Sequence, residues 1–284
     1  MVDFFLAEHS EHGGGNGELL FSVVNGEATV TGYEGEPVSI VIPDFFGCYP
    51  VTELRDNAFC NCATLKEICI SQNVRKIGHH CFYACSHLKR AELPAGLIEI
   101  GAGCFCGCDR LTDIELPEML KALPESCFRA CLSLEELALP EELESIGGLC
   151  FSDCEKLSRV NVGESIGSIG DGAFFMCPEL TDIYLPPACE SIGFRALGYG
   201  CSGIELTKND ELRITGERGS AAQKYALENG FLFSERKEAA ESFASVSSVL
   251  KSNADMHELI LSGAIVLAAF TAVVIRCFIL HKRK

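Results

Sequence analysis

Six phenylalanines recur at a strict interval of 23 residues along this 284-residue chain: Phe59, Phe82, Phe105, Phe128, Phe151 and Phe174. A fixed period between about 20 and 29 residues is typical of a solenoid, in which each turn is one supersecondary unit stacked on the last. One such turn cannot bury its own apolar face, but stacked turns share a continuous core. The period therefore predicts a repeat solenoid.

Each repeat, written from Ile77, follows the pattern Ile-Gly-x-x-Cys-Phe-x-x-Cys-x-x-Leu-x-x-Ala-x-Leu-Pro-x-x-Leu-x-x. The apolar positions five, six, nine and twelve have the spacing i, i+1, i+4 and i+7, which predicts a short helical turn. Apolar and polar residues alternate around positions 15 and 17, which predicts a strand. The following proline ends this strand because its nitrogen cannot donate to the ladder. The sequence thus predicts an α/β repeat solenoid with 23-residue turns.

The regular pattern breaks down at both ends of the repeats. Short strands around Asn25-Gly26 predict an N-terminal cap, and a helix between Ser220 and Gly230 predicts a C-terminal cap. Atypical end units are expected because an exposed solenoid end is an aggregation-prone edge. We predict a flexible leader at 1–17, the N-terminal cap at 18–53, the 23-residue repeats at 54–206, the C-terminal cap at 207–233, a stalk at 234–257, a transmembrane helix at 258–280 and a basic tail at 281–284.

The predicted transmembrane helix rests on an uncharged, mostly apolar run from Leu259 to Ile275, which continues to Leu280 after Arg276. A helix over these residues would be roughly 33 Å long, enough to span a bilayer. Arg276 lies near enough to its end to snorkel into the headgroups. A buried core helix is the alternative, but the run is apolar on every side and lies beyond the repeats.

The repeat unit resembles the BspA-type leucine-rich repeat. The segments through Tyr33 and Ile42-Pro43, and from Gly219 to Phe231, are similar to the caps of that family, so the resemblance covers about residues 18–233. It implies a right-handed leucine-rich-repeat solenoid, no catalytic residues, and a role in cell-surface adhesion or recognition. The chain departs from the family because its first residues do not resemble a signal peptide and because it carries the C-terminal apolar segment.

The seventeen cysteines allow three interpretations. Free cysteine is a small buried hydrophobe, which suits the eleven that fall at apolar positions of the repeat. Disulfides are disfavoured because in-register side chains of stacked turns point the same way. A metal site is disfavoured because the dense stretches Cys104–Cys108 and His79–His87 lack paired C-x-x-C spacing. Cys60, Cys69 and Cys106 lie off these positions and are predicted to be the more reactive thiols. The eleven apolar-position cysteines are Cys62, Cys81, Cys85, Cys104, Cys108, Cys127, Cys131, Cys150, Cys154, Cys177 and Cys189.

Catalytic and cofactor signatures are not recognisable in the sequence. No Ser/His/Asp or Cys/His arrangement stands out, so we predict no enzymatic activity, no cofactor and no metal. Gly13-Gly14-Gly15 is not followed by the Gly-Lys-Ser/Thr of a phosphate loop. The net charge of −17 disfavours nucleic acid binding, because an acidic surface repels phosphate.

The exposed strand residues between the apolar positions predict a binding face. Basic residues gather in the first two turns of this face, and acidic residues dominate the next two. We predict a polar protein-binding surface, and an ordinary solvated sheet face is the alternative. The candidate residues are Lys66, Glu67, Lys89, Arg90, Glu92, Asp113, Glu115, Glu135, Glu136, Arg159, Asn161, Asp182 and Tyr184.

The sequence is consistent with two classes of function. One is a membrane-anchored protein-interaction scaffold with adhesin-like binding, and the other is a structural spacer or assembly module without a specific ligand. The expected partners are an unidentified protein and a lipid bilayer through 258–280. The basic tail favours repeats outside the cell by the positive-inside rule. The lack of a recognisable signal peptide and the abundant thiols favour repeats that face the cytosol, so we prefer a single-pass tail anchor, with cell-surface exposure as the alternative.

Overall fold

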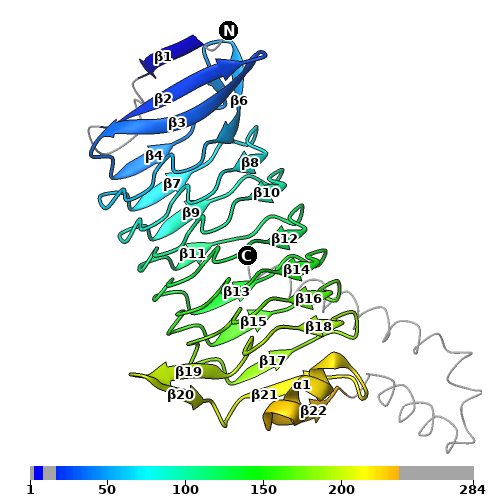
Figure 1. Ribbon diagram of the computed structural model, residues 1–284. Helices are drawn as coiled ribbons and strands as arrows, with labels where there is room; N and C mark the ends of the chain where they lie inside the picture. The colour runs from blue at the N-terminus through cyan, green and yellow to red at the C-terminus, as the bar shows by residue number, and fades with distance from the viewer. Residues whose placement is uncertain (1–2, 9–16, 237–284) are drawn as a thin grey trace, which may run out of the picture. The chain divides into compact units, whose positions relative to one another are not determined.

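The computed structural model describes residues 3–8 and 17–236 (Figure 1). The chain divides into two compact units, Met1–Glu235 and Arg236–Lys284, and the strands and the helix described here belong to the first. No helix in the described ranges is long and apolar enough to cross a membrane. The predicted transmembrane helix at 258–280, the basic tail at 281–284 and most of the stalk at 234–257 lie outside the described residues.

Two rows of short parallel strands run along the solenoid, because every turn contributes one strand to each row (Figure 1). The first row holds β4 (Ser39–Val41), β7 (Glu67–Cys69), β9 (Arg90–Glu92), β11 (Asp113–Ile114), β13 (Glu136–Ala138), β15 (Arg159–Asn161), β17 (Asp182–Tyr184) and β21 (Arg213–Gly216). The second row holds β6 (Tyr49–Leu54), β8 (Lys76–Ile77), β10 (Glu99–Ile100), β12 (Ala122–Leu123), β14 (Ser145–Ile146), β16 (Ser168–Ile169) and β18 (Ser191–Ile192). The sequence predicted the first row alone, since a two-residue strand is too short to show an alternating pattern.

The prediction of a helical turn at positions five to twelve is wrong. Positions four and eight adopt left-handed backbone conformations, as in His80 (φ 53°) and Ala84 (φ 55°), and such residues cannot extend an α-helix. The segment forms consecutive tight turns that bond to the next repeat, for example from the Phe82 amide to the Cys104 carbonyl at 2.8 Å. The described repeats are therefore a β-solenoid, and the helix of the described chain, α1 (Ala221–Asn229), lies in the C-terminal cap.

The phenylalanines of position six form a ladder in the core. Their ring centroids lie 5.1 to 5.5 Å apart from one turn to the next, with interplanar angles of 4 to 14°. All six side chains are fully buried. Tyr33 of the N-terminal cap extends the stack, because its ring lies 5.7 Å from that of Phe59.

The N-terminal cap is an antiparallel sheet of β1 (Asp3–Glu8), β2 (Gly17–Val24) and β3 (Glu27–Gly35), and β3 pairs in parallel with β6. The short strand β5 (Phe45–Phe46) also pairs with β6. Strand β1 lies within the segment 1–17 that we expected to be a flexible leader. The hairpin turn between β2 and β3 is formed by Asn25 and Gly26, both with positive φ.

The C-terminal cap closes the ladder with a tyrosine. It contains α1, β22 (Leu232–Glu235) and the hairpin of β19 (Tyr199–Ser202) and β20 (Glu205–Lys208). Ser220 and Gly230 cap the helix as the sequence predicted. Leu197 takes the phenylalanine position of the last turn, and the Tyr225 hydroxyl accepts its amide at 3.0 Å and donates to its carbonyl at 3.1 Å. One hydroxyl thus satisfies both backbone groups that a further turn would otherwise bind.

Glycine at position two lets neighbouring turns of the second row approach closely. A Cβ added to Gly101 would lie 2.3 Å from the backbone nitrogen of His79, and one added to Gly147 would meet backbone at 2.5 Å. The Gly101 amide also donates to the Ile77 carbonyl of the previous turn at 2.8 Å. This position therefore requires both a missing Cβ and an available N–H group.

One turn has Pro124 at this position instead. Proline carries a Cβ and has no N–H, so it can neither allow the close approach nor donate the bond. Within the described chain, β10 pairs with β8 and β12 with β14, but β10 and β12 do not pair. The first row is interrupted at the same junction, between β11 and β13. The two turns remain joined on the side of the phenylalanine ladder, because the Phe105 amide donates to the Cys127 carbonyl at 2.8 Å. The described strands of both rows are unpaired at this junction while the phenylalanine side is bonded, so the junction opens as a wedge.

We predict that Pro124→Gly closes the wedge on the second-row side. The amide created at this position should bond to the Ile100 carbonyl and exchange its hydrogen as slowly as the amides of Gly101 and Gly147, which serve as internal references. The added bond contributes about 1 kcal/mol. Losing proline and gaining glycine both increase the conformational entropy of the unfolded chain, together by about 1–2 kcal/mol, so the free energy of unfolding should fall by no more than about 1 kcal/mol. Exchange as fast as in an unstructured loop would show that proline does not cause the opening.

Candidate functional site

The structure brings the predicted face residues together along the first row of strands. Six occupy position 14, the first residue of each strand: Glu67, Arg90, Asp113, Glu136, Arg159 and Asp182. Four occupy position 16, two residues later on the same face: Glu92, Glu115, Asn161 and Tyr184. Three precede the strands: Lys66, Lys89 and Glu135. All are exposed except Tyr184, which is half-buried and donates to Glu164 at 2.9 Å.

The charges at position 14 alternate along the solenoid axis. Glu67 faces Arg90, which in turn faces Asp113. After the junction, Glu136 faces Arg159. Further along, Asp182 of β17 faces Arg213 of β21. Opposite charges on directly facing residues stabilise neighbouring strands, so this pattern supports the stacking as well as shaping the surface.

Ion pairs between the turns follow this alternation. Arg90 lies 3.4 Å from the Asp113 carboxylate and also pairs with Glu92 on its own strand. Arg159 lies 3.1 Å from the Glu136 carboxylate. The Asp113 and Glu92 carboxylates raise the pKa of Arg90, and a hydrogen bond from Cys69, together with Arg90, lowers the pKa of Glu92. The basic cluster inferred for the first turns is thus partly neutralised by neighbouring carboxylates.

A groove of about 510 Å³ lies at the break between β11 and β13. Four carboxylates and one guanidinium line it, with leucine side chains beneath. These residues are Asp113, Glu115, Glu118, Glu136, Arg159, Leu116 and Leu139. A second break of the first row separates β15 from β17, where Arg159 and Asp182 carry opposite charges, so like charges do not account for every interruption.

The eleven cysteines expected in the core are all buried, and the sixteen described cysteines are free thiols. The thiols at position nine do more than fill space. Five of the six, all except Cys62, donate to the phenylalanine carbonyl of the preceding turn, as Cys154 does to Phe128 and Cys177 to Phe151, both at 3.1 Å. This bond could not be predicted from the sequence, because it depends on how closely neighbouring turns stack, and the repeat pattern does not fix the distances between individual atoms.

Two of the three thiols expected to be reactive, Cys69 and Cys106, lie in surroundings that do not activate them. Cys60, Cys69 and Cys106 are half-buried, and burial raises the pKa of Cys69 and of Cys106. A raised pKa lowers the thiolate fraction at neutral pH, and thiolate is the nucleophile. Among the described cysteines, Cys48 and Cys201 are exposed, and neither is one of the thiols that the sequence predicted to be reactive.

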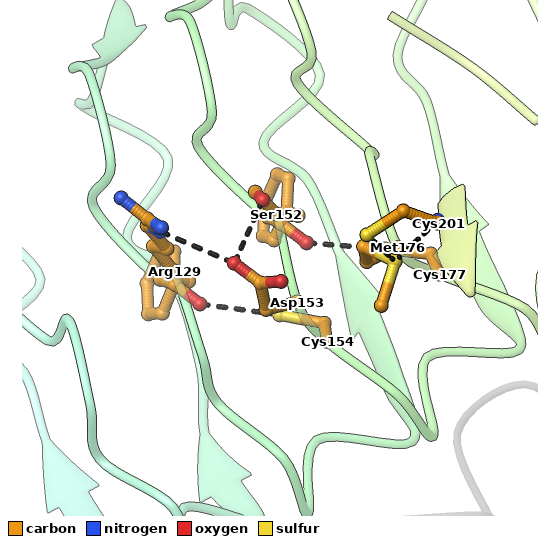
Figure 2. A network of polar contacts seen from close by, with 9 residues as sticks. Arg129, Ser152, Asp153, Cys154, Met176, Cys177 and Cys201 are labelled. Carbon is orange, nitrogen blue, oxygen red and sulfur yellow. Dashed lines mark hydrogen bonds and ion pairs between the residues drawn. The ribbon is translucent and has the colours of Figure 1, made fainter. Parts of the chain in front are cut away.

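Figure 2 shows the polar contacts on the tight-turn side of the later repeats. Arg129 binds Asp153 at 3.2 Å, and Ser152 donates to the same carboxylate at 3.0 Å. The Met176 sulfur accepts the Cys201 amide at 3.0 Å. The contacts of Arg129 with Asp153 and of Met176 with Cys201 join neighbouring turns, whereas Ser152 and Asp153 are adjacent residues of one turn. No group of three or more His, Cys, Asp or Glu side chains in the described ranges could hold a metal ion.

Comparisons with known proteins agree with this architecture. The family described as "BspA type Leucine rich repeat region" matches in six copies, over residues 52–181 and 98–217, more than half of the chain. A crystal structure of a leucine-rich cell surface protein from Faecalibacterium prausnitzii is 29% identical, with a TM-score of 0.62. The match covers 75% of this chain and 55% of that one, so this chain spans about half of that relative.

A crystal structure of the leucine-rich repeat protein of T. pallidum is 28% identical, with a TM-score of 0.57. That match covers 66% of this chain and 86% of the T. pallidum chain. No curated protein gives a significant match. At these identities the fold and the repeat are shared.

The buried thiols predict steep unfolding at alkaline pH. Burial is the largest cause that raises the pKa of Cys85 and Cys154 to about 12 and of Cys189 to about 11. It also raises the pKa of Cys81, Cys104, Cys108, Cys127, Cys131, Cys150 and Cys177. Above about pH 9 the unfolded chain releases thiol protons that the native chain retains, so the stability present at neutral pH is lost as pH rises. Each thiol contributes roughly 1.4 kcal/mol per pH unit, and several together match the typical stability of a domain, about 5–15 kcal/mol. Urea unfolding at pH 7, 8, 9 and 10 measures this slope.

A variant at position five provides the comparison for this slope, because alanine already occupies that position in three turns, at Ala58, Ala173 and Ala196. Replacing the four position-five cysteines with alanine should remove about four protons from the difference in bound protons between the native and unfolded chains. The free energy of unfolding should therefore fall less steeply with pH. Replacing the exposed Cys48 and Cys201 with alanine should leave it unchanged. If the fourfold variant has the same slope as the wild type, the buried thiols are not the cause of the alkaline loss of stability. The four substitutions are Cys81→Ala, Cys104→Ala, Cys127→Ala and Cys150→Ala.

Proposed function

This chain belongs to the BspA-type leucine-rich repeat family, and on that premise we propose that it is a non-enzymatic scaffold that binds a protein partner through the first-row face. The observation that supports the proposal most is the long charged face itself. Its strands carry charged side chains outward over successive turns, and no other described element covers the row from β7 to β15 (Figure 1). Solenoids bind partners through such extended surfaces.

The chemistry of the face indicates the kind of partner. Charged and polar groups dominate the face, and Tyr184 is the one aromatic residue among the predicted face residues. Sugars are bound by stacking on aromatic rings, so the face suits a polar protein surface better than a sugar. The cell-surface protein of Faecalibacterium prausnitzii, which shares this fold, supports an adhesin-like role. A structural spacer without a specific ligand is the competing function.

We also propose that residues 258–280 anchor the protein in a bilayer. The support is the apolar composition of Leu259 to Ile275 and the basic residues that follow Leu280. In the preferred orientation the repeats face the cytosol, and in the alternative orientation they face the cell exterior.

The anchor and its orientation predict the outcome of protease treatment of cells that produce the full-length protein. The protein should sediment with membranes, and its repeats should resist protease in intact cells but not in permeabilised cells. Recovery from the soluble fraction would contradict the anchor. Cleavage of the repeats in intact cells would instead establish surface exposure.

We predict that charge reversal on the first-row face abolishes partner capture. Full-length protein carrying Arg90→Glu and Glu136→Lys keeps its net charge but inverts the local pattern, so a partner crosslinked by the wild type should be recovered at least tenfold less. The matched control is Lys76→Glu with Glu144→Lys, which makes the same exchange on and beside the second row. Circular dichroism checks that both variants fold. Equal capture by wild type and the first-row variant would favour the spacer function.

A further inference from the structure

The groove between β11 and β13 lies where the charge alternation of the first row fails. Asp113 binds Arg90 of the preceding turn, and Glu136 binds Arg159 of the following turn. Each carboxylate thus has its arginine on the side away from the break, and the two carboxylates occupy equivalent positions across it. Like charges at such positions repel, so a cation placed between them would restore the alternating order.

The opening at this junction is a property of the backbone. Among the described residues, no backbone hydrogen bond joins 112–117 to 134–140, although the junctions on either side, from β9 to β11 and from β13 to β15, are paired. On the opposite side of the same turns, β10 and β12 do not pair either, and Pro124 lies at that junction. The groove therefore does not depend on the rotamer of one surface side chain.

The lining of the groove suits a long cationic side chain. Glu115 and Glu118 add two carboxylates to those of Asp113 and Glu136, while Leu116 and Leu139 provide apolar surface below them. Arg159, which also lines the groove, is paired with Glu136, and Glu118 accepts the Glu141 amide at 3.3 Å, so carboxylate groups still outnumber the one guanidinium. Lysine and arginine combine an aliphatic stem, which packs on apolar groups, with a charged head that binds carboxylates. A volume of about 510 Å³ also exceeds what a single metal ion would fill.

We propose that this groove binds a lysine or arginine side chain presented by an extended basic segment of the partner protein. The proposal rests on the proposed protein-binding function and identifies the chemistry of the bound segment. The groove contributes the carboxylates, and the partner supplies the cation that the first row lacks between Asp113 and Glu136.

The test uses the full-length protein and a fluorescent peptide of alternating lysine, glycine and serine, with binding measured by fluorescence anisotropy. Asp113→Asn with Glu136→Gln removes the two facing charges and should weaken binding about tenfold, which corresponds to about 1.4 kcal/mol. The control, Glu144→Gln with Glu190→Gln, removes two exposed carboxylates near the second row and should change binding less than twofold. Hydrogen exchange of 112–118 and 136–139 should slow when the peptide is bound.

Several outcomes would overturn the proposal. Equal weakening in both double variants would mean that the peptide responds to the overall charge of −17 and to no particular site. Absence of binding to the wild type, or exchange protection elsewhere, would equally exclude the groove. The proposed function is judged separately by capture of the partner with the charge-reversal variants. Capture that depends on the first-row face, together with failure of the basic peptide, would refute this inference alone.

Discussion

Close stacking of consecutive turns is the constraint on which the rest of this structure depends. The phenylalanine rings lie 5.1 to 5.5 Å apart, and this spacing is compatible with backbone hydrogen bonds between the turns. It explains why position two is glycine, since a Cβ at Gly101 would meet the backbone of His79 at 2.3 Å. It also places five position-nine thiols within reach of a phenylalanine carbonyl of the preceding turn, as with Cys154 and Phe128.

The same constraint accounts for both the closed end and the open junction. Tyr225 ends the ladder because its hydroxyl takes the two bonds that a further turn would make to Leu197. Pro124 keeps two turns apart on one side because it lacks an N–H and carries a Cβ. A buried backbone group without a partner is costly, so each interruption of the stack needs such a local explanation. The junction at Pro124 coincides with the break between Asp113 and Glu136, so both rows of strands are interrupted between the same two turns.

The candidate site was predictable in position but not in detail. The period of 23 placed Arg90 and Glu136 on one exposed row, because strand residues of the same position stack in register. The sequence also suggested a simple gradient from basic to acidic. Ion pairs between turns change that picture, since Arg90 is shared between Asp113 and Glu92 and does not act as a free basic patch.

The sequence by itself determined the repeat length, the core positions and the burial of eleven cysteines, because periodic apolar residues allow one way of burying a continuous face. It also gave the helix cap at Ser220, whose signal is local. It did not determine the conformation of the tight-turn segment, since a helix and consecutive turns bring the same positions inward and differ in backbone φ at residues such as His80. Only the tertiary structure decided where the stack opens, because the effect of Pro124 depends on the distance to the neighbouring turn, which no local pattern in the sequence records.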